Sequence, residues 1–157
     1  MRLPNLLATR RGRLAAFFLL YLTEGIPSGF TGTAIATQMR RQGLDPALIG
    51  TFIGALYLPW AIKWAFGPFV DVLSSERWGR RRLWIVGTQA MMAITLLVAM
   101  AVDFKTQLPL FTGIIVVLNL FAATQDVAID ALAVNVLHPE ERGLPHGHIF
   151  GGQNLAI

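Results

Sequence analysis

"LPLFTGIIVVLNLFAATQDVAIDALAV", residues 108–134, decides what kind of protein this chain is. The apolar run continues through Val136 and holds only two ionisable residues, Asp126 and Asp130. Apolar stretches of about 18 or more residues are long enough to cross a bilayer as a helix. Residues 108–136 therefore predict a transmembrane helix that carries two carboxyl groups where charge is costly.

The composition of the whole chain also indicates a membrane protein. The chain has 157 residues, 54% hydrophobic and 14% charged, with a mean hydropathy of +0.55. Soluble domains carry about 25% charged residues. The net charge of +4 does not indicate nucleic-acid binding, because the arginines cluster at the ends of apolar segments. The chain has no cysteine, so disulfide and thiolate chemistry are excluded.

Further apolar segments flank this run, and short polar connections join them. Short connections make successive helices antiparallel neighbours. We expect an all-α membrane protein with four full transmembrane helices and the start of a fifth, forming one partial bundle over residues 1–157. The expected spans are about 14–39, 49–70, 83–102 and 108–136, with the fifth from about 148.

Basic residues predict the orientation of these spans. One side holds Arg2, Arg10, Arg11, Arg13, Arg77, Arg80, Arg81 and Arg82 if the spans alternate. The opposite side holds only Arg40, Arg41 and Lys105. Cytoplasmic loops of membrane proteins carry the excess of Lys and Arg, so the N-terminus is expected in the cytoplasm.

Three spans carry polar side chains on one face at helical spacing. These are Tyr21, Glu24, Ser28 and Thr31 on the first span, Lys63 on the second, and Asn119, Asp126 and Asp130 on the fourth. At 1.5 Å per residue, the four charged groups lie about 9–15 Å from the same end of their spans. They are therefore at depths that let them meet, and the uncharged ones are expected to line a cavity.

A lone charge at the centre of a membrane helix costs about 2.5–3.5 kcal/mol. The four charged groups must pair, face a polar cavity or hold protons. A Lys63–Asp bridge that only joins helices is one reading. A transport path is the other, in which Asp126, Asp130 and Glu24 handle protons and Lys63 is their counter-charge. Carboxyl groups one turn apart would titrate as a unit.

The second loop, "GPFVDVLSSERWGRRR" at residues 67–82, places an acid before a basic cluster. Asp71 sits at a helix C-terminus, which is unfavourable for an anion and calls for a cation nearby. The expected gating loop comprises Asp71, Gly79, Arg80, Arg81 and Arg82. The alternative is that these arginines only fix the orientation of the loop.

Four motifs in order resemble one family: "LPWAIKWAFGPFVD" (58–71), "WGRRR" (78–82), "ATQDVAIDALAV" (123–134) and "PEERG" (139–143). They are similar to the major facilitator superfamily, in the branch of AmpG-type muropeptide permeases and acetyl-coenzyme-A transporters. The resemblance covers Pro59, Lys63, Pro68, Asp71, Arg80 to Arg82, Gln125, Asp126, Asp130 and Glu140 to Arg142.

The resemblance implies the N-terminal portion of a two-bundle transporter whose first and fourth helices line a central cavity. It also implies uptake of cell-wall muropeptides or a related solute, driven by protons across a bacterial inner membrane. The partners implied are the lipid bilayer, a small-molecule or glycopeptide substrate, protons and a missing C-terminal half.

Other function classes fit the sequence less well. An intramembrane aspartyl protease needs two carboxylates from different helices, whereas Asp126 and Asp130 share one helix, so no enzyme is expected. The "HGH" at His146 to His148 is typical of a plain loop, and we expect no metal and no cofactor. The alternative that stays open is a structural or assembly module of membrane helices without transport of its own.

Overall fold

The computed structural model describes residues 6–72 and 81–137, and every regular element within these ranges is a helix. The elements are η1 (Leu6–Ala8), α1 (Arg10–Gly29), η2 (Phe30–Ile35), α2 (Ala36–Arg41), α3 (Pro46–Leu56), α4 (Leu58–Ala61), η3 (Lys63–Ala65), α5 (Phe66–Val72), α6 (Arg82–Met100) and α7 (Leu108–Val136). Within the described ranges they form four candidate membrane spans: Arg10–Arg41, Pro46–Val70, Arg82–Met100 and Leu108–Val136. The predicted all-α membrane fold with four full spans is confirmed. The fifth segment expected from about residue 148 lies outside the described residues.

The first span is one continuous rod with an irregular middle. It begins where the Thr9 hydroxyl accepts a hydrogen bond from the Gly12 amide at 3.2 Å, which caps α1. Pro27 lies inside α1, and the six-residue π-helical segment η2 follows directly. Segments of π-helix widen the turn and often occur at functional sites.

The second span departs from the single helix that its apolar pattern predicts. It is divided into α3, α4, η3 and α5, with breaks at Tyr57 and at Ile62. Pro59 causes the first break because it has no backbone N–H for the preceding turn. Lys63 begins η3, which is a single turn of 3₁₀-helix. The second break therefore lies next to the one lysine of this span.

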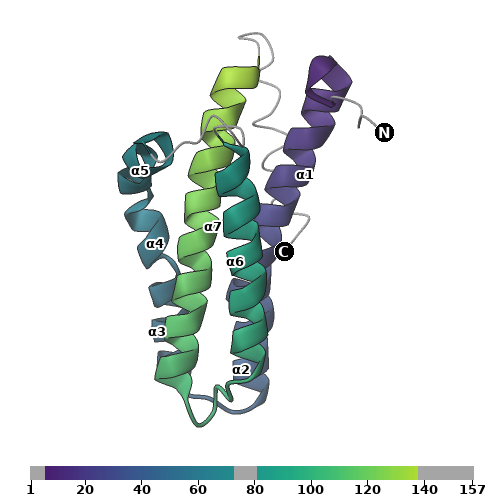
Figure 1. Ribbon diagram of the computed structural model, residues 1–157. Coiled ribbons are helices and arrows are strands. Elements are labelled where there is room, and N and C mark those ends of the chain that lie inside the picture. Colours follow the sequence, from purple (N-terminus) through teal and green to yellow (C-terminus); the bar gives the residue numbers. More distant parts are fainter. Residues whose placement is uncertain (1–5, 73–80, 138–157) are drawn as a thin grey trace.

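Helix α7 is the centre of the bundle (Figure 1) and contacts elements of all three other spans. Helix α6 packs most extensively on it, through buried residues at helical spacing: Ile85, Thr88, Met92, Thr95 and Ala99. The segments α3, α4 and α5 contact α7 as well, and so does α1. Buried side chains on α7 can therefore meet partners from several spans.

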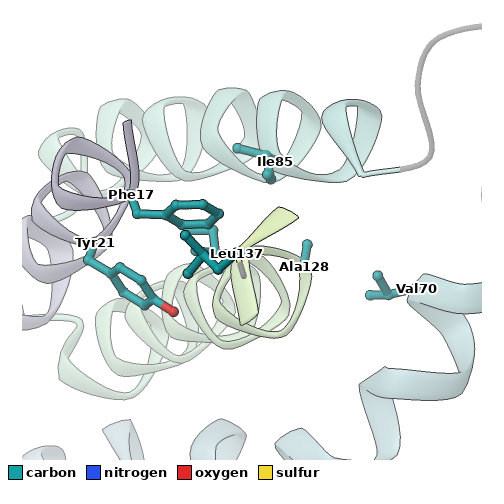
Figure 2. Packing of buried hydrophobic residues seen from close by; sticks show 7 residues of the cluster. Phe17, Tyr21, Val70, Ile85, Ala128 and Leu137 are labelled. Atoms are coloured by element: carbon teal, nitrogen blue, oxygen red, sulfur yellow. The ribbon is translucent and has the colours of Figure 1, made fainter. Parts of the chain in front are cut away.

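One apolar cluster joins α1, α5, α6 and α7 at the end where α7 finishes. Figure 2 shows Phe17 and Tyr21 reaching from α1 toward α7, with Ile85 on the α6 side. The Phe17 ring is almost completely buried, and so are Val70 and Ala128. This packing fixes the rotation of α1 against α7, and it therefore fixes where the polar face of α1 points.

Candidate functional site: a charged cluster across three spans

The two acids of α7 are one helical turn apart and point in the same direction. Asp126 is buried, with 5% of its surface exposed, whereas Asp130 is exposed. The two carboxyl groups thus have different surroundings although they share one face.

Lys63 forms an ion pair with Asp126. The ammonium nitrogen lies 2.5 Å from the Oδ2 atom of Asp126, and the side chains are 41% and 6% exposed. The same ammonium lies 5.8 Å from the centre of the Trp60 ring, which adds a cation–π contact. A hydrogen bond between two ionised groups is roughly twice as strong as one between neutral groups. This contact therefore joins the broken second span to α7.

Tyr21 connects the first span to the other acid. Its hydroxyl donates a hydrogen bond of 2.6 Å to the Oδ1 atom of Asp130, and its ring is 2% exposed. Figure 2 shows the hydroxyl directed from α1 toward α7. The sequence predicts Tyr21 as a cavity-lining residue, and the structure gives it a defined partner that holds Asp130 in place.

Glu24 completes the cluster from the first span. It is 1% exposed, one turn along α1 from Tyr21, and its carboxyl group lies near that of Asp126. Two carboxylates at close range repel each other when both are ionised. The cluster therefore brings carboxyl groups of two different helices together.

The predicted charged residues come together, then, from α1, η3 and α7. Three acids, one lysine and one tyrosine hydroxyl form this group, which we call the charged cluster: Tyr21, Glu24, Lys63, Asp126 and Asp130. The sequence indicated that the depths agree. It did not indicate which acid Lys63 or Tyr21 would choose, because that depends on the rotation of each helix about its axis.

The predicted cavity-lining residues Ser28, Thr31 and Asn119 also come together, beside this cluster. They line a cleft of about 260 Å³ with residues of the second span, among them Tyr57 and Trp60. Thr31 donates to the carbonyl of Pro27 at 2.8 Å, and the Asn119 amide donates to the carbonyl of Ile115 at 2.9 Å. Tyr21 does not line this cleft.

The predicted gating loop falls largely outside the described residues, which exclude Gly79, Arg80 and the side chain of Asp71. Arg81 donates to the carbonyl of Val70 at 3.4 Å, so it bridges from the start of α6 to the end of the second span. Arg82 is the first residue of α6 and is exposed. The pairing of Asp71 with the arginines stays a prediction. His146 and His148 also lie outside the described residues.

Gln125 is a residue that helical patterns alone do not single out. It is completely buried, and in the described part of the chain neither atom of its amide has a hydrogen-bond partner. An unsatisfied buried polar group costs about 1–3 kcal/mol. The one feature of the sequence that could have pointed to Gln125 is its position directly before Asp126.

Comparison with known proteins places this arrangement in a family. The family model described as acetyl-coenzyme A transporter 1 matches residues 14–155. A putative transporter AmpG 4 of Rickettsia conorii is 27% identical over 148 residues, which are 92% of this chain and 36% of the relative. The anhydromuropeptide permease of Escherichia coli K12 is 29% identical over 133 residues, 83% of this chain and 26% of the relative. No solved structure matches.

The chain therefore spans about a quarter to a third of the length of these curated relatives. The match of the family model covers most of the chain, and it includes the residues of the charged cluster and of the cleft. The relatives are transporters and not enzymes, and the four apolar spans make this chain a multi-pass membrane protein. The chain belongs to the acetyl-coenzyme A transporter 1 family, a transporter family of the major facilitator type.

Proposed function

We propose that the chain is part of a secondary transporter that takes up cell-wall muropeptides or a related solute together with protons. The observation that carries this proposal is the charged cluster, in which acids from two spans lie together with a lysine from a third. Ionisable groups inside membrane spans usually belong to ion or substrate paths. A merely structural bridge needs one acid for one lysine, whereas this site contains three acids.

The geometry supplies a way to couple a proton to a movement of helices. With a proton between Glu24 and Asp126, the first span and α7 are joined, and Asp126 also holds Lys63. Without it, two carboxylates face each other and repel, which favours separation of α1 from α7. A site whose helix contacts change with one proton is what alternation between two states requires.

The charge of the cluster supports a muropeptide-like solute over coenzyme A. Acids outnumber the lysine three to one among these described groups. Coenzyme A carries several phosphate charges, which such a site would repel. The relatives named above include an anhydromuropeptide permease, and that agrees with the same choice.

We further propose that the chain works with additional membrane helices as its partner, since it spans at most 36% of the relatives given above. The polar face of α1 and α7 would then form one wall of a cavity, and the additional helices would form the other. An assembly module without transport is the competing function. It requires that the charges pair statically and that a pH gradient has no effect.

Uptake into proteoliposomes tests the proposed function. The transporter that contains this chain is expected to accumulate a radiolabelled muropeptide when the side of addition is made acidic by one pH unit. It is expected to lose accumulation when an uncoupler removes the gradient. Accumulation that is indifferent to the uncoupler would disprove proton coupling. The absence of any uptake by an intact, correctly inserted protein would favour the assembly module.

We also propose a bacterial inner-membrane location with the N-terminus in the cytoplasm. The first turns of α1 and α6 lie at one end of the bundle (Figure 1) and carry Arg10, Arg11, Arg13, Arg81 and Arg82. The connection between the first two spans lies at the other end with Arg40 and Arg41. The excess of arginine supports a cytoplasmic first end.

Thiol labelling of intact cells checks this orientation, and the chain's lack of cysteine gives a clean background. An impermeant reagent is expected to label Asp45→Cys, at the end opposite the N-terminus, and not Ser75→Cys. After the cells are opened, both variants should react, which controls for access. Labelling of Ser75→Cys alone in intact cells would reverse the proposed orientation.

A further inference from the structure

The cleft beside the charged cluster is built from three spans and has no charged group in its lining. Its polar residues are Ser28, Thr31 and Thr33 from the first span and Asn119 from α7, and its aromatic residues are Tyr57 and Trp60. The hydroxyl groups lie at the end of α1 and in η2, where the wider π-helical turn shifts the side chains around the axis. Tyr57 lies at the break that Pro59 causes, and Trp60 lies in α4 directly after it. Its position therefore follows from two local irregularities in otherwise ordinary helices.

This cleft differs in chemistry from the larger cavities of the described structure. Cavities of about 600 and 620 Å³ lie along α6 and α7, and their linings are almost entirely apolar. The cleft of about 260 Å³ is smaller and combines aromatic rings with hydroxyl and amide groups. Apolar grooves on a membrane protein suit lipid or helix contacts, whereas mixed linings of this kind suit a polar ligand.

The hydrogen bonds already made inside the cleft determine what its walls offer to a ligand. The Thr31 hydroxyl uses its proton on the Pro27 carbonyl, and the Asn119 Nδ2 atom donates to the Ile115 carbonyl. What remains at these two buried residues is the Thr31 hydroxyl oxygen and the Asn119 Oδ1 atom, both acceptors. A ligand group that only accepts hydrogen bonds finds no donor at these two residues. Hydroxyl groups of a ligand can donate to both, and they can also accept from the hydroxyl groups of Ser28, Thr33 and Tyr57.

The aromatic wall adds a second requirement. Tyr57 is 66% exposed and three residues before Trp60, so its ring is available along the same side of the cleft. A flat ligand with an apolar face gains contact with such rings, and its polar edge reaches the acceptors opposite. A pyranose ring combines apolar C–H faces with a rim of donating hydroxyl groups.

We propose that this cleft binds a pyranose ring of the transported solute, beside the charged cluster. The inference rests on the proposed function. Two distances along helices and one contact place the two sites next to each other. Ser28 is one turn beyond Glu24, Asn119 is about 10 Å from Asp126 along α7 at 1.5 Å per residue, and Trp60 contacts the Lys63 ammonium. The sugar of a sugar–peptide would thus lie in the cleft, next to the charged cluster.

Ligand-observed NMR on the chain in lipid nanodiscs tests this site directly. Saturation transfer to N,N′-diacetylchitobiose is the probe, and coenzyme A is the comparison ligand. Wild type is expected to bind the disaccharide saturably and to show no binding of coenzyme A that competes with it. Tyr57→Leu and Trp60→Leu are each expected to weaken binding about three- to tenfold, because an aromatic contact contributes about 0.5–1.5 kcal/mol.

Trp64→Leu is the matched control, since Trp64 is 79% exposed, lies one turn beyond Trp60 and does not line the cleft. Tyr57→Leu removes an exposed ring, so it keeps the test valid if Trp60→Leu disturbs the fold. Equal losses in the control, no disaccharide binding, or displacement of the disaccharide by coenzyme A would overturn the inference.

The binding experiment and the uptake experiment can fail independently of each other. Disaccharide binding that depends on Tyr57, without gradient-driven uptake, retains the ring site and rejects proton coupling. Gradient-driven uptake with no disaccharide binding rejects the ring site alone.

Discussion

Replacing Lys63 with methionine is expected to destabilise the helical bundle by about 2–3 kcal/mol. Asp126 is 6% exposed and would lose its cation, and an unpaired charge inside the membrane costs this much. The loss is set toward the lower end of what buried ion pairs show, because the Lys63 side chain is 41% exposed in the bundle. Asp126→Leu should cost less, because the long side chain of the remaining lysine can extend its ammonium group toward the membrane interface.

The double variant Lys63→Met/Asp126→Leu should recover most of the loss, since it leaves no charge uncompensated. Circular dichroism of the chain in detergent, followed during unfolding, gives the four stabilities of a double-mutant cycle. Lys105→Met is the control, because Lys105 is exposed in the turn between α6 and α7. If the two single losses simply add in the double variant, the 2.5 Å contact between Lys63 and Asp126 does not stabilise the bundle, which would contradict the charged cluster as described.

Asp126→Asn in the complete transporter is expected to abolish gradient-driven accumulation while substrate exchange continues. A gradient of one pH unit provides about 1.4 kcal/mol per proton, which supports about tenfold accumulation. Asparagine keeps the shape of the side chain but cannot share a proton with Glu24 or balance Lys63. The accumulation ratio should therefore fall from about ten to about one. Exchange of internal for external substrate needs no net proton movement and should persist.

Asp130→Asn is expected to have the smaller effect, because an amide oxygen can still accept the hydrogen bond from Tyr21. Asp103→Asn, in the exposed turn after α6, should behave like wild type and serves as the matched control. Uptake and exchange of radiolabelled substrate in the same proteoliposomes measure both properties. If Asp126→Asn and Asp130→Asn both accumulate substrate as wild type does, the acids are structural and the Lys63 bridge is their whole function.

The four spans were predictable because the relevant physics is local. Backbone groups in lipid must be satisfied within the segment, so a long apolar run such as that around Ile115 has little choice but to be a helix. The division of the second span was not predicted from its apolar pattern. Pro59 was visible, but whether a proline kinks or breaks a membrane helix depends on which neighbours satisfy the freed carbonyl groups.

The sequence predicted which residues come together in the site, but it did not predict which of them pair with one another. Helical spacing brought Asp126 and Asp130 to one face, and similar depth brought Glu24 and Lys63 to them. The choice of Asp126 by Lys63 and of Asp130 by Tyr21 depends on how α1 and η3 are rotated against α7. The packing of Phe17 against the other spans sets that rotation, and such long-range packing has no periodic signature in the sequence. The proximity of Glu24 to Asp126 rather than to Asp130 could not be predicted for the same reason.

Proton movement driven by substrate tests the central claim most directly. In proteoliposomes with no imposed gradient, a pH-sensitive dye outside the vesicles reports protons that enter together with added muropeptide. With wild-type transporter, the external medium should become more alkaline on addition of substrate, and with Asp126→Asn it should not, although exchange shows that the variant still binds substrate. Substrate entry by the wild type without any change in external pH would contradict proton coupling through this cluster.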